Sequence, residues 1–572
     1  MVVRVARVRF IDIRNFRCLK ALTWAPSPGI NCLIGPGDSG KSSVLDALDY
    51  CLGARRHLSF TDADFHRLDV NEPIMITVTI GDLDDAMKSM ETYGNHLRSF
   101  DAETATVDDE PEAGRETVLT LRLTVKNDLE PVWTLVSDRA EAQGQARYLT
   151  WADRLRLCPT RIGAFAENDL AWRRGSVLTK LSDEKAETSG ALAEAARTAR
   201  AAFGDLADKQ LAGTLGIVAD TARDLGIDVG GMPKALLDAH SVSFSGGTIA
   251  LHSESGIPLR GLGTGSTRLL VAGLQRKAAK QATVILIDEL EHGLEPHRIR
   301  RLLHSLGAKE TAPPLQGFLT THSPVALREM AAEQLTLLRR GADKHTALCV
   351  GTTSDVQGTV RRFPEAFLAE SVLVCEGASE VGLVRGIDQY DTDHGSTSMT
   401  ARGVELVDAG GCDNIYGRAN AFRALGYRVT VLRDDDKEPK AGIEAAFIAA
   451  TGPIFKWRDG RALEDELFDG LPDHAIEALL DYAVELHGAE LIDDHIKSVS
   501  RNTFTLESCR ARITGKVRST LVEACTTKAT PWFKNVSAME YVGRAIVAPC
   551  HKDWEEGFAA IIKSVFSWID NE

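Results

Sequence analysis

The chain has 572 residues, of which 44% are hydrophobic and 26% charged. This is the composition of a globular protein of several domains, and it excludes collagen-like, low-complexity and strongly disordered classes. Lys and Arg number 66 against 81 Asp and Glu, a net charge of −15, so nucleic-acid binding must rest on a local basic patch or on metal ions that screen carboxylates.

The N-terminal segment MVVRVARVRFIDIRNF alternates apolar and basic side chains and predicts a strand, not a secretory signal. No apolar run approaches the ~18 residues of a membrane-spanning helix. The ten cysteines occur singly, without a C-x-x-C pair, which favours neither a disulfide scaffold nor a zinc ribbon. We therefore expect a cytoplasmic protein with no membrane association.

Residues 31–34 predict a strand, and the segment that follows matches the phosphate-binding motif G-x-x-x-x-G-K-[ST]. Backbone N–H groups are expected to surround the β-phosphate, Lys41 to reach the β and γ oxygens, and the Ser42 hydroxyl to bind Mg²⁺. A predicted helix follows, with its N-terminus toward the phosphates. The residues expected to bind ATP here are Gly35, Gly37, Asp38, Ser39, Gly40, Lys41, Ser42 and Ser43.

Three zones of the chain differ in pattern. Residues 1–165 and 240–365 alternate β-branched runs, Gly-rich turns and helical stretches, which predicts one α/β layered domain. Between them, residues 166–239 have apolar positions at three- and four-residue spacing and predict a helical insertion. It is expected to serve as a dimerisation or packing arm, with a plain helical subdomain as the alternative. A second α/β domain is predicted over 366–572, its C-terminal part helical and basic.

The second half of the first domain contains three further candidate groups. Gly265 and Ser266, in GLGTGS, could present backbone N–H groups and a hydroxyl to a nucleotide held by another subunit; a flexible loop is the alternative. The apolar strand 284–287 ends in Asp288, expected to hold Mg²⁺, and Glu289, expected to polarise the attacking water. An acidic helix start is the alternative there. His322 could sense a γ-phosphate or be structural.

These motifs, in this order, resemble the ABC-type ATPase head of the SMC/RecF class. The segments that carry the resemblance are IDIRNFRCL, GPGDSGKSS, LRGLGTGSTRLL, LIDELEHGLEP and TTHSP. The resemblance implies that two heads sandwich ATP, with the signature loop of one head facing the phosphate loop of the other. The signature here departs from the usual Leu-Ser-Gly-Gly-Gln.

A second set of acidic residues follows two predicted strands. Residues 371–375 form a buried-strand pattern that ends in Glu376-Gly377, and YRVTVLR leads into Asp434, Asp435 and Asp436. By period-two geometry Asp434 and Asp436 face one way and Asp435 the other. Carboxylates gathered at one sheet edge would repel each other unless divalent cations bind, so we expect Mg²⁺ or Mn²⁺, two ions ~4 Å apart. Two acidic surface turns are the alternative.

This zone resembles a Toprim domain, and its union with an ABC-type head resembles the OLD (overcoming lysogenization defect) family of ATP-dependent endonucleases. The size and layout of the chain are similar to those of the nuclease-ATPase subunit of the Gabija antiphage system. Other members of the family have the same size and layout. The resemblance implies that Glu380 and Glu464 also bind metal, with Glu466 a competitor for the latter role. It further implies a lysine that stabilises the pentavalent phosphate, Lys534 or alternatively Lys516.

The expected function is a nucleotide-regulated, metal-dependent DNA endonuclease or nickase. The family resemblance implies a role in antiphage defence. Expected partners are double-stranded DNA, further copies in an even homo-oligomer and a helicase-like protein. The alternative is a non-nucleolytic, ATP-switched clamp or scaffold of the SMC/RecF type, which would usually carry long heptad arms. No motif for a topoisomerase or primase is present. Between residues 501 and 535, seven basic side chains against two acidic ones predict a phosphate path or a solvated helix face.

Overall fold

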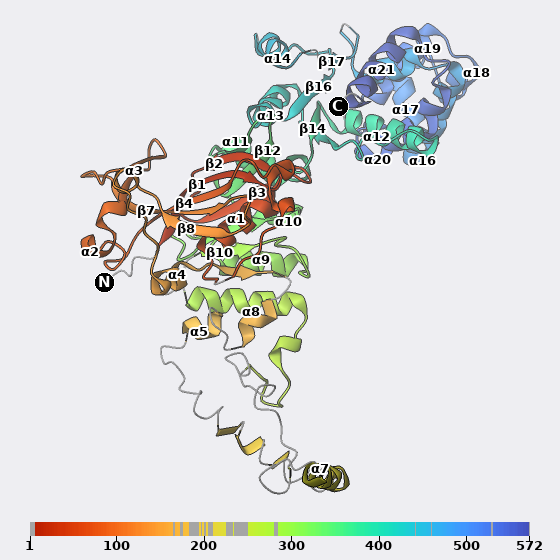
Figure 1. Ribbon diagram of the computed structural model, residues 1–572. Helices are drawn as coiled ribbons and strands as arrows, with labels where there is room; N and C mark the ends of the chain where they lie inside the picture. The colour runs from red at the N-terminus through yellow and green to blue at the C-terminus, as the bar shows by residue number, and fades with distance from the viewer. Residues whose placement is uncertain are drawn as a thin grey trace. The chain divides into compact units, whose positions relative to one another are not determined.

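The chain forms two compact units, the first of Met1–Cys32 with Ser42–Thr321 and the second of Leu33–Lys41 with His322–Glu572. The domain boundaries predicted near residues 165, 240 and 366 divide the chain by motif and stay predictions. The computed structural model (Figure 1) describes residues 6–55, 57–163, 166–171, 176–181, 194–195, 197–199, 202–203, 210–224, 233, 250–278, 284–440, 442–452, 454–458, 460–527 and 530–570.

The first unit contains a seven-stranded sheet in the order β2-β1-β4-β7-β5-β6, with β8 paired to β7. Its strands pair antiparallel. Ile11 and Ile13 on β1 are fully buried and alternate with more exposed neighbours, so the predicted N-terminal strand is confirmed over Arg7–Phe16. The other strands are β2 (Leu19–Trp24), β4 (Ile74–Gly81), β5 (Leu97–Asp101), β6 (Thr106–Asp108), β7 (Glu116–Val125) and β8 (Pro131–Leu135).

Three strands of the first unit pair in parallel, with β10 (Val284–Ile287) between β9 (Thr160–Ile162) and β11 (Gln316–Thr320). All residues of β10 and β11 are buried, as is usual where helices cover both faces of a parallel sheet. Asp288 directly follows β10 and therefore stands at the carboxyl edge of this ladder, where open α/β sheets bind ligands.

The phosphate loop follows β3 (Ile30–Ile34), all of whose residues are buried, and leads into α1 (Lys41–Leu52). The helices α8 (Thr264–Lys277) and α9 (Pro296–Ser305) pack against each other (Figure 1). The remaining described α-helices of the first unit are α2 (Met90–Tyr93), α3 (Asp138–Ala142), α4 (Trp151–Leu157), α5 (Val177–Leu181) and α7 (Ala212–Asp224).

Much of the predicted helical insertion, residues 166–239, lies outside the described residues. Of its described parts, α5 places Val177 and Leu178 in a small buried cluster with Ala278. On α7 the side chains of Ile217 and Val218 are exposed. The predicted role of this segment in dimerisation stays a prediction.

The second unit contains a parallel four-stranded sheet in the order β15-β14-β16-β17. In its register Cys375 of β14 pairs with Asp408 of β15 and with Leu432 of β16. The carboxyl ends of the three strands are therefore level. The strands are β14 (Ser371–Cys375), β15 (Val404–Asp408), β16 (Arg428–Arg433) and β17 (Phe455–Lys456), and a separate antiparallel pair joins β12 (Leu335–Arg340) to β13 (His345–Cys349).

Helices cover this sheet and build a large apolar core, which includes Leu373, Trp457, Phe468 and Trp532. None of the helices among the described residues is long and apolar enough to cross a membrane. The helices of the second unit are α10 (Pro324–Glu329), α11 (Ser354–Arg362), α12 (Ala378–Asp393), α13 (Cys412–Ala424), α14 (Ile443–Thr451), α15 (Leu463–Gly470), α16 (Asp473–His487), α17 (Ala489–Ser500), α18 (Leu506–Ala511), α19 (Gly515–Cys525), α20 (Val536–Tyr541), the π-helix η8 (Val542–Val547) and α21 (Glu556–Asp570).

Glycines let α12 approach α20 and η8 at backbone distance. A Cβ atom on Gly382 would lie 2.5 Å from the Val536 carbonyl oxygen, and one on Gly386 would lie 2.2 Å from the Glu540 carbonyl oxygen. Gly543 in η8 would meet a backbone carbonyl of α12 at 2.6 Å. Any side chain at these positions forces the helices apart.

We expect Gly386→Ala to destabilise the second unit by about 1–3 kcal/mol, the usual cost of overpacking a closely packed contact. Its thermal unfolding midpoint, followed by circular dichroism, should fall by several degrees. Gly417→Ala is the matched control, since Gly417 also lies inside a helix but has open space around its Cβ position; it should be neutral or stabilising by up to about 1 kcal/mol. Equal midpoints for the two variants would contradict the packing argument.

Candidate active site

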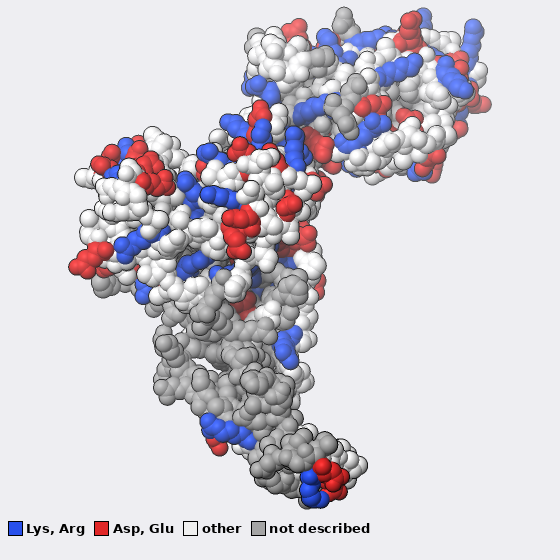
Figure 2. Space-filling model, in the orientation of Figure 1, with Lys and Arg blue, Asp and Glu red and all other residues white. Residues whose placement is uncertain are grey.

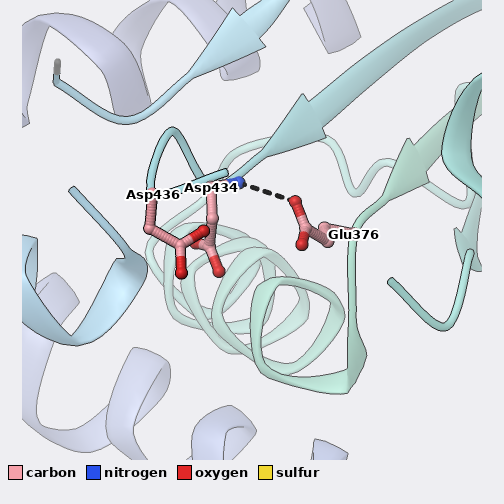
Figure 3. Close-up of side chains that lie close together, drawn as sticks. All are labelled: Glu376, Asp434 and Asp436. Carbon is pink, nitrogen blue, oxygen red and sulfur yellow. Dashed lines mark hydrogen bonds between the residues drawn. The ribbon is translucent and has the colours of Figure 1, made fainter. Parts of the chain in front are cut away.

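Three carboxylates meet at the carboxyl edge of the parallel sheet in the second unit. Glu376 directly follows β14, and Asp434 and Asp436 follow β16. The backbone N–H of Glu376 donates to the Leu432 carbonyl at 2.9 Å, and that of Asp434 donates to Glu376 Oε2 at 3.1 Å. One carboxylate oxygen from each of the three residues lies within 4.8 Å of the others, and Figure 3 shows the side chains gathered in one place.

The middle residue of the acidic triplet faces away from this cluster, as the period-two pattern predicts. Asp435 Oδ1 lies 3.1 Å from Arg433 Nη2 and 3.4 Å from Lys456 Nζ. Its other oxygen accepts from the backbone N–H of Gly460 at 3.1 Å. Asp435 is therefore neutralised by its own partners and is not available to the cluster.

Glu380 folds back over the start of α12. Its Oε2 accepts a hydrogen bond from the backbone N–H of Gly377 at 2.9 Å, which caps the first turn of the helix. The side chain is almost fully buried. The negative charge of Glu380 acts on the acidic cluster, because Glu380 interacts electrostatically with both Glu376 and Asp434.

The two glutamates that the sequence offers as alternative metal ligands, Glu464 and Glu466, both lie in the first turn of α15 but have different surroundings. Asp434 Oδ1 accepts from the backbone N–H of Leu463 at 3.0 Å, which places the start of α15 on the acidic loop. The buried Glu464 interacts electrostatically with Glu380 and Asp434. Glu466 instead accepts from the backbone N and Nε of Arg458, both at 2.9 Å, and is occupied by that ion pair.

Burial, together with nearby negative charge, raises the pKa values of four acids at this site. Burial, with the charges of Glu464 and Glu376, raises the pKa of Glu380 to about 7. Burial, with the charges of Glu380, Glu376 and Glu464, raises the pKa of Asp434 to about 9. Burial also raises the pKa of Glu376 and of Glu464.

Positive charge near this cluster opposes the effect of burial only in part: Lys437 and Arg433 act to lower the pKa of Glu376, which burial raises. Lys534, exposed just before α20, partly opposes the effect of burial on the pKa of Glu464. Lys516 is exposed in the first turn of α19. Part of the basic stretch is neutralised, because Arg510 pairs with Asp481 and Arg518 bonds to Asp473 at 2.5 Å; Lys528 of that stretch lies outside the described residues.

The donor set fits a divalent cation. Its ligand atoms are all carboxylate oxygens, which Mg²⁺ and Mn²⁺ prefer. Several acids held together with raised pKa values form the arrangement that a bound cation relieves. The residues that could hold it are Glu376, Glu380, Asp434, Asp436 and Glu464.

The phosphate loop begins with a glycine that no residue with a side chain could replace. Gly35 has φ of 135°, and a Cβ there would lie 2.6 Å from the Leu338 carbonyl oxygen. The ammonium of Lys41 donates to the carbonyls of Gly35 and Pro36 at 3.0 and 2.8 Å and lies 3.3 Å from Ser39 Oγ. The lysine therefore lies across its own loop, with its charge turned to the loop's oxygens.

The other predicted residues of this loop adopt the turns that the motif requires. Asp38 has φ of 56° and Gly40 φ of 93°, both left-handed; aspartate is one of the few residues with a side chain that tolerate this region. A Cβ on Gly37 would meet open space. The Ser43 hydroxyl lies 3.6 Å from Cys18 Sγ.

The magnesium ligands predicted in the first unit lie together. Ser42 Oγ donates to Asp288 Oδ1 at 3.1 Å, and the Thr320 hydroxyl donates to the same oxygen at 2.6 Å. Glu289, expected to orient water, has φ of 48° and an exposed side chain. Its backbone N–H donates to Thr320 Oγ1 at 2.8 Å, so a left-handed turn at Glu289 is tied to β11.

Two arginines that the sequence did not single out complete this centre. The buried Arg268 of α8 donates to the carbonyls of Asp288, Glu289 and His292 at 2.9, 3.0 and 2.8 Å. Arg161 of β9 lies 3.8 Å from Asp288. Both line a cavity of about 600 Å³ beside the acidic pair. No motif marks them, because each acts through contacts distant in sequence.

The predicted signature-loop residues lie at the start of α8. A Cβ on Gly265 would lie 2.3 Å from the Gly293 carbonyl oxygen, so only glycine fits against the turn after the acidic pair. Ser266 Oγ accepts from Arg298 at 3.1 Å. His322 is exposed and precedes α10. The roles predicted for these three residues stay predictions.

Comparison with known proteins adds two family matches. Residues 30–328, more than half of the chain, match the family model described as "AAA domain, putative AbiEii toxin, Type IV TA system". Residues 367–436 match the model described as "Overcoming lysogenization defect protein-like, TOPRIM domain". The second match begins just before β14 and ends at Asp436, and so includes the two strands that carry the acidic cluster.

Shorter similarities connect the chain to the DNA replication and repair protein RecF. It is 47% identical to RecF of Prosthecochloris aestuarii over 45 residues, 8% of this chain and 12% of that protein. It is 52% identical to RecF of Vibrio vulnificus strain YJ016 over 60 residues, 10% and 16% of the two chains. These matches thus span only a small part of each RecF.

Among solved structures, the chain is similar to SMC heads. One is an SmcHead bound to the C-winged helix domain of ScpA, at 15% identity and a TM-score of 0.34, over 60% of this chain and 96% of that one. Another is the SMC head domain from Thermotoga maritima, at 13% identity and a TM-score of 0.29, over 60% of this chain and 100% of that one.

The predicted α/β fold class, an ATPase domain followed by a Toprim domain, is confirmed by the two family matches and by the parallel sheets that carry both acidic centres. An ATPase domain joined to a Toprim domain of this kind is the composition of a nuclease-ATPase that uses a nucleotide and a divalent metal. The chain therefore belongs to the AAA-domain family matched over residues 30–328 and combines that domain with an OLD-like Toprim domain, the ATPase–Toprim layout of the OLD family.

Proposed function

We propose that this protein is a divalent-metal-dependent DNA endonuclease or nickase whose cutting is controlled by nucleotide bound in its ATPase domain. The observation that carries the proposal is the meeting of Glu376, Asp434 and Asp436 within 4.8 Å at one sheet edge. Carboxylates gathered at one place are the usual ligand set for Mg²⁺ or Mn²⁺ in phosphodiester hydrolysis.

The proposed metal ligands are the three residues of this cluster with Glu380 and Glu464. When bound there, one or two divalent ions would supply a nucleophilic water and stabilise charge on the phosphate. Glu376 is held for this task by the Asp434 backbone, and Asp434 by the Leu463 backbone. Lys534 is proposed to stabilise the pentavalent phosphate, because its charge is exposed and reaches Glu464.

In the ATPase domain, the phosphate loop from Gly35 to Ser43 is proposed to hold the nucleotide, with Lys41 released from its own loop to the phosphates. Ser42 and Asp288, already hydrogen-bonded to each other, would hold Mg²⁺. Glu289 would orient the hydrolytic water. Gly265, Ser266 and His322 are proposed to contact nucleotide in an assembled dimer.

The biological setting is part of the proposal. Double-stranded DNA is the proposed substrate, and antiphage defence the proposed role, by the likeness to OLD proteins. We propose domains at 1–165 with 240–365 and at 366–572, and an even homo-oligomer in which residues 166–239 contribute to dimerisation. The exposed apolar side chains of α7 support this last point. A helicase-like partner is proposed by the same likeness.

The first test is cleavage of supercoiled plasmid in Mg²⁺ or Mn²⁺. We expect nicked or linear products from the wild type and at least a ~100-fold slower reaction for Glu376→Gln, since ligand loss should exceed the ~10–100-fold effect of losing a residue behind a ligand. Glu438→Gln, an exposed acid beside the same loop, is the matched control and should cut like the wild type. Intact plasmid under every nucleotide and metal condition would rule out the nuclease.

The second test uses pH. The carboxyl pKa values of about 7 for Glu380 and about 9 for Asp434 lie far above the unfolded value of about 4, so the folded protein keeps protons that the unfolded chain releases. Without metal, stability should therefore fall as pH rises from about 4 to about 9. Bound cations displace these protons, so Mg²⁺ affinity by calorimetry should increase from pH 6 to pH 9 with proton release. A pH-independent affinity would contradict this.

The third test concerns nucleotide control. Lys41→Ala removes a charge-assisted contact to phosphate and should weaken ATP binding by ~10–100-fold, measured with a fluorescent ATP analogue. Its DNA cleavage should then no longer respond to ATP, and comparison with the wild type gives the sign of the control. Lys20→Ala, an exposed lysine on β2, is the control variant. Unchanged ATP binding in Lys41→Ala would exclude this loop as the nucleotide site.

A further inference from the structure

The last residue of β16 is a buried arginine beside the acidic cluster. Arg433 is 2% exposed, which is rare for a charged side chain unless its partners are fully provided. It directly precedes Asp434. No sequence motif marks it, because the pattern of the strand and its acidic end does not depend on it.

The guanidinium of Arg433 makes five close contacts. Nε donates to Glu444 Oε2 at 2.8 Å, and Nη2 lies 2.8 Å from the same oxygen and 3.1 Å from Asp435 Oδ1. Nη1 donates to the carbonyl oxygen of Asp434 and, at 3.4 Å, to that of Lys437. Three of these contacts are hydrogen bonds and two are ion pairs, so every nitrogen of the guanidinium has a partner within the protein.

These contacts enclose the acidic loop. The carbonyls of Asp434 and Lys437 lie on either side of Asp436, and both are held by one nitrogen of Arg433. The loop thus has a fixed curvature that turns Asp434 and Asp436 toward Glu376 while Asp435 is held on the opposite side. Without this hold, repulsion between like charges would favour a more open loop.

The arginine is itself held from two helices. Glu444, in the first turn of α14, accepts from Arg433 and also from the Tyr416 hydroxyl of α13 at 2.5 Å. Tyr416 packs edge to face on Phe447 of α14, with ring centroids 5.6 Å apart. The position of the guanidinium is therefore set by side chains from α13 and α14.

Burial and these contacts argue against a direct role with DNA. A phosphate contact would require Arg433 to leave the carbonyls and the two carboxylates at once. The geometry points instead to an action through the loop.

We propose that Arg433, held by Glu444 and Tyr416, is the positioning residue that fixes the Asp434–Asp436 loop for metal binding. This rests on the proposed metal site, because the loop carries two of its ligands. Arg433 is a positioning residue and not a catalytic one, since its guanidinium is bonded to the loop backbone and to Glu444.

Metal binding itself provides the test. Mn²⁺ is titrated into the full chain without nucleotide, and free Mn²⁺ is measured by electron paramagnetic resonance. Arg433→Gln should weaken Mn²⁺ binding by ~10–100-fold, as loss of a residue behind metal ligands does, and Arg433→Lys should fall between, since an ammonium cannot reproduce the fork. Cleavage by Arg433→Gln should need more metal but recover much of its rate at saturating Mn²⁺.

Arg428→Gln is the matched control. Arg428 begins the same strand and stacks on Trp568 at 4.2 Å, so its loss removes an arginine without touching the loop. It should bind Mn²⁺ like the wild type. If Arg428→Gln and Arg433→Gln weaken binding equally, or if Arg433→Gln binds like the wild type, the proposal is wrong.

A double-mutant cycle separates positioning from general damage. Because Glu444 acts through Arg433, Glu444→Gln should weaken binding less than Arg433→Gln does, and the double variant should match Arg433→Gln alone. If the double variant instead lost Mn²⁺ affinity by the product of the two single effects, Glu444 would not act through Arg433 and the proposal would be contradicted. A wild type that neither binds Mn²⁺ nor cuts DNA would instead defeat the proposed function, so the two failures are distinguishable.

Discussion

Parallel pairing of β14 with β15 and β16 is the constraint on which the second unit depends. Parallel ladders bring the carboxyl ends of their strands to one edge, and the register sets Cys375 level with Leu432. The residues that leave the sheet next are therefore neighbours in space although 58 positions separate Glu376 from Asp434. The helices α12 and α15 then only have to bring Glu380 and Glu464 to a place that the sheet has already defined.

The same arrangement recurs at the two acidic centres. At each, carboxylates follow a fully buried strand, and a buried arginine donates to the backbone carbonyls of the acidic turn: Arg268 at Asp288 and Glu289, Arg433 at Asp434. These bonds hold the turn through the backbone carbonyls of Asp288 and Asp434 and not through their carboxylates, whereas direct pairing with an arginine would neutralise a carboxylate. Asp435 and Glu466 show the contrast, since each is paired directly with arginine.

Most of the fold and the three central acids could be predicted from the sequence, because they follow local patterns. These patterns are a β-branched run, a glycine that permits the turn, and alternation along an extended chain. The ion pair of Glu466 was beyond the sequence, because that pair depends on where Arg458 lies after folding. Arg161, Arg268 and Arg433 were missed for the same reason, as their partners lie on other elements or are backbone atoms. The roles of the signature loop and of His322 depend on an assembly of chains that one sequence does not describe.

The close contact of α12 with α20 has a mechanical consequence. The two helices run in the same direction, with Gly382 and Gly386 against the carbonyls of Val536 and Glu540, one turn apart on α20. Main chain touches main chain there, so neither helix can slide without the other. The backbone of Glu380, in the first turn of α12, is thus kept at a fixed spacing from the first turn of α20.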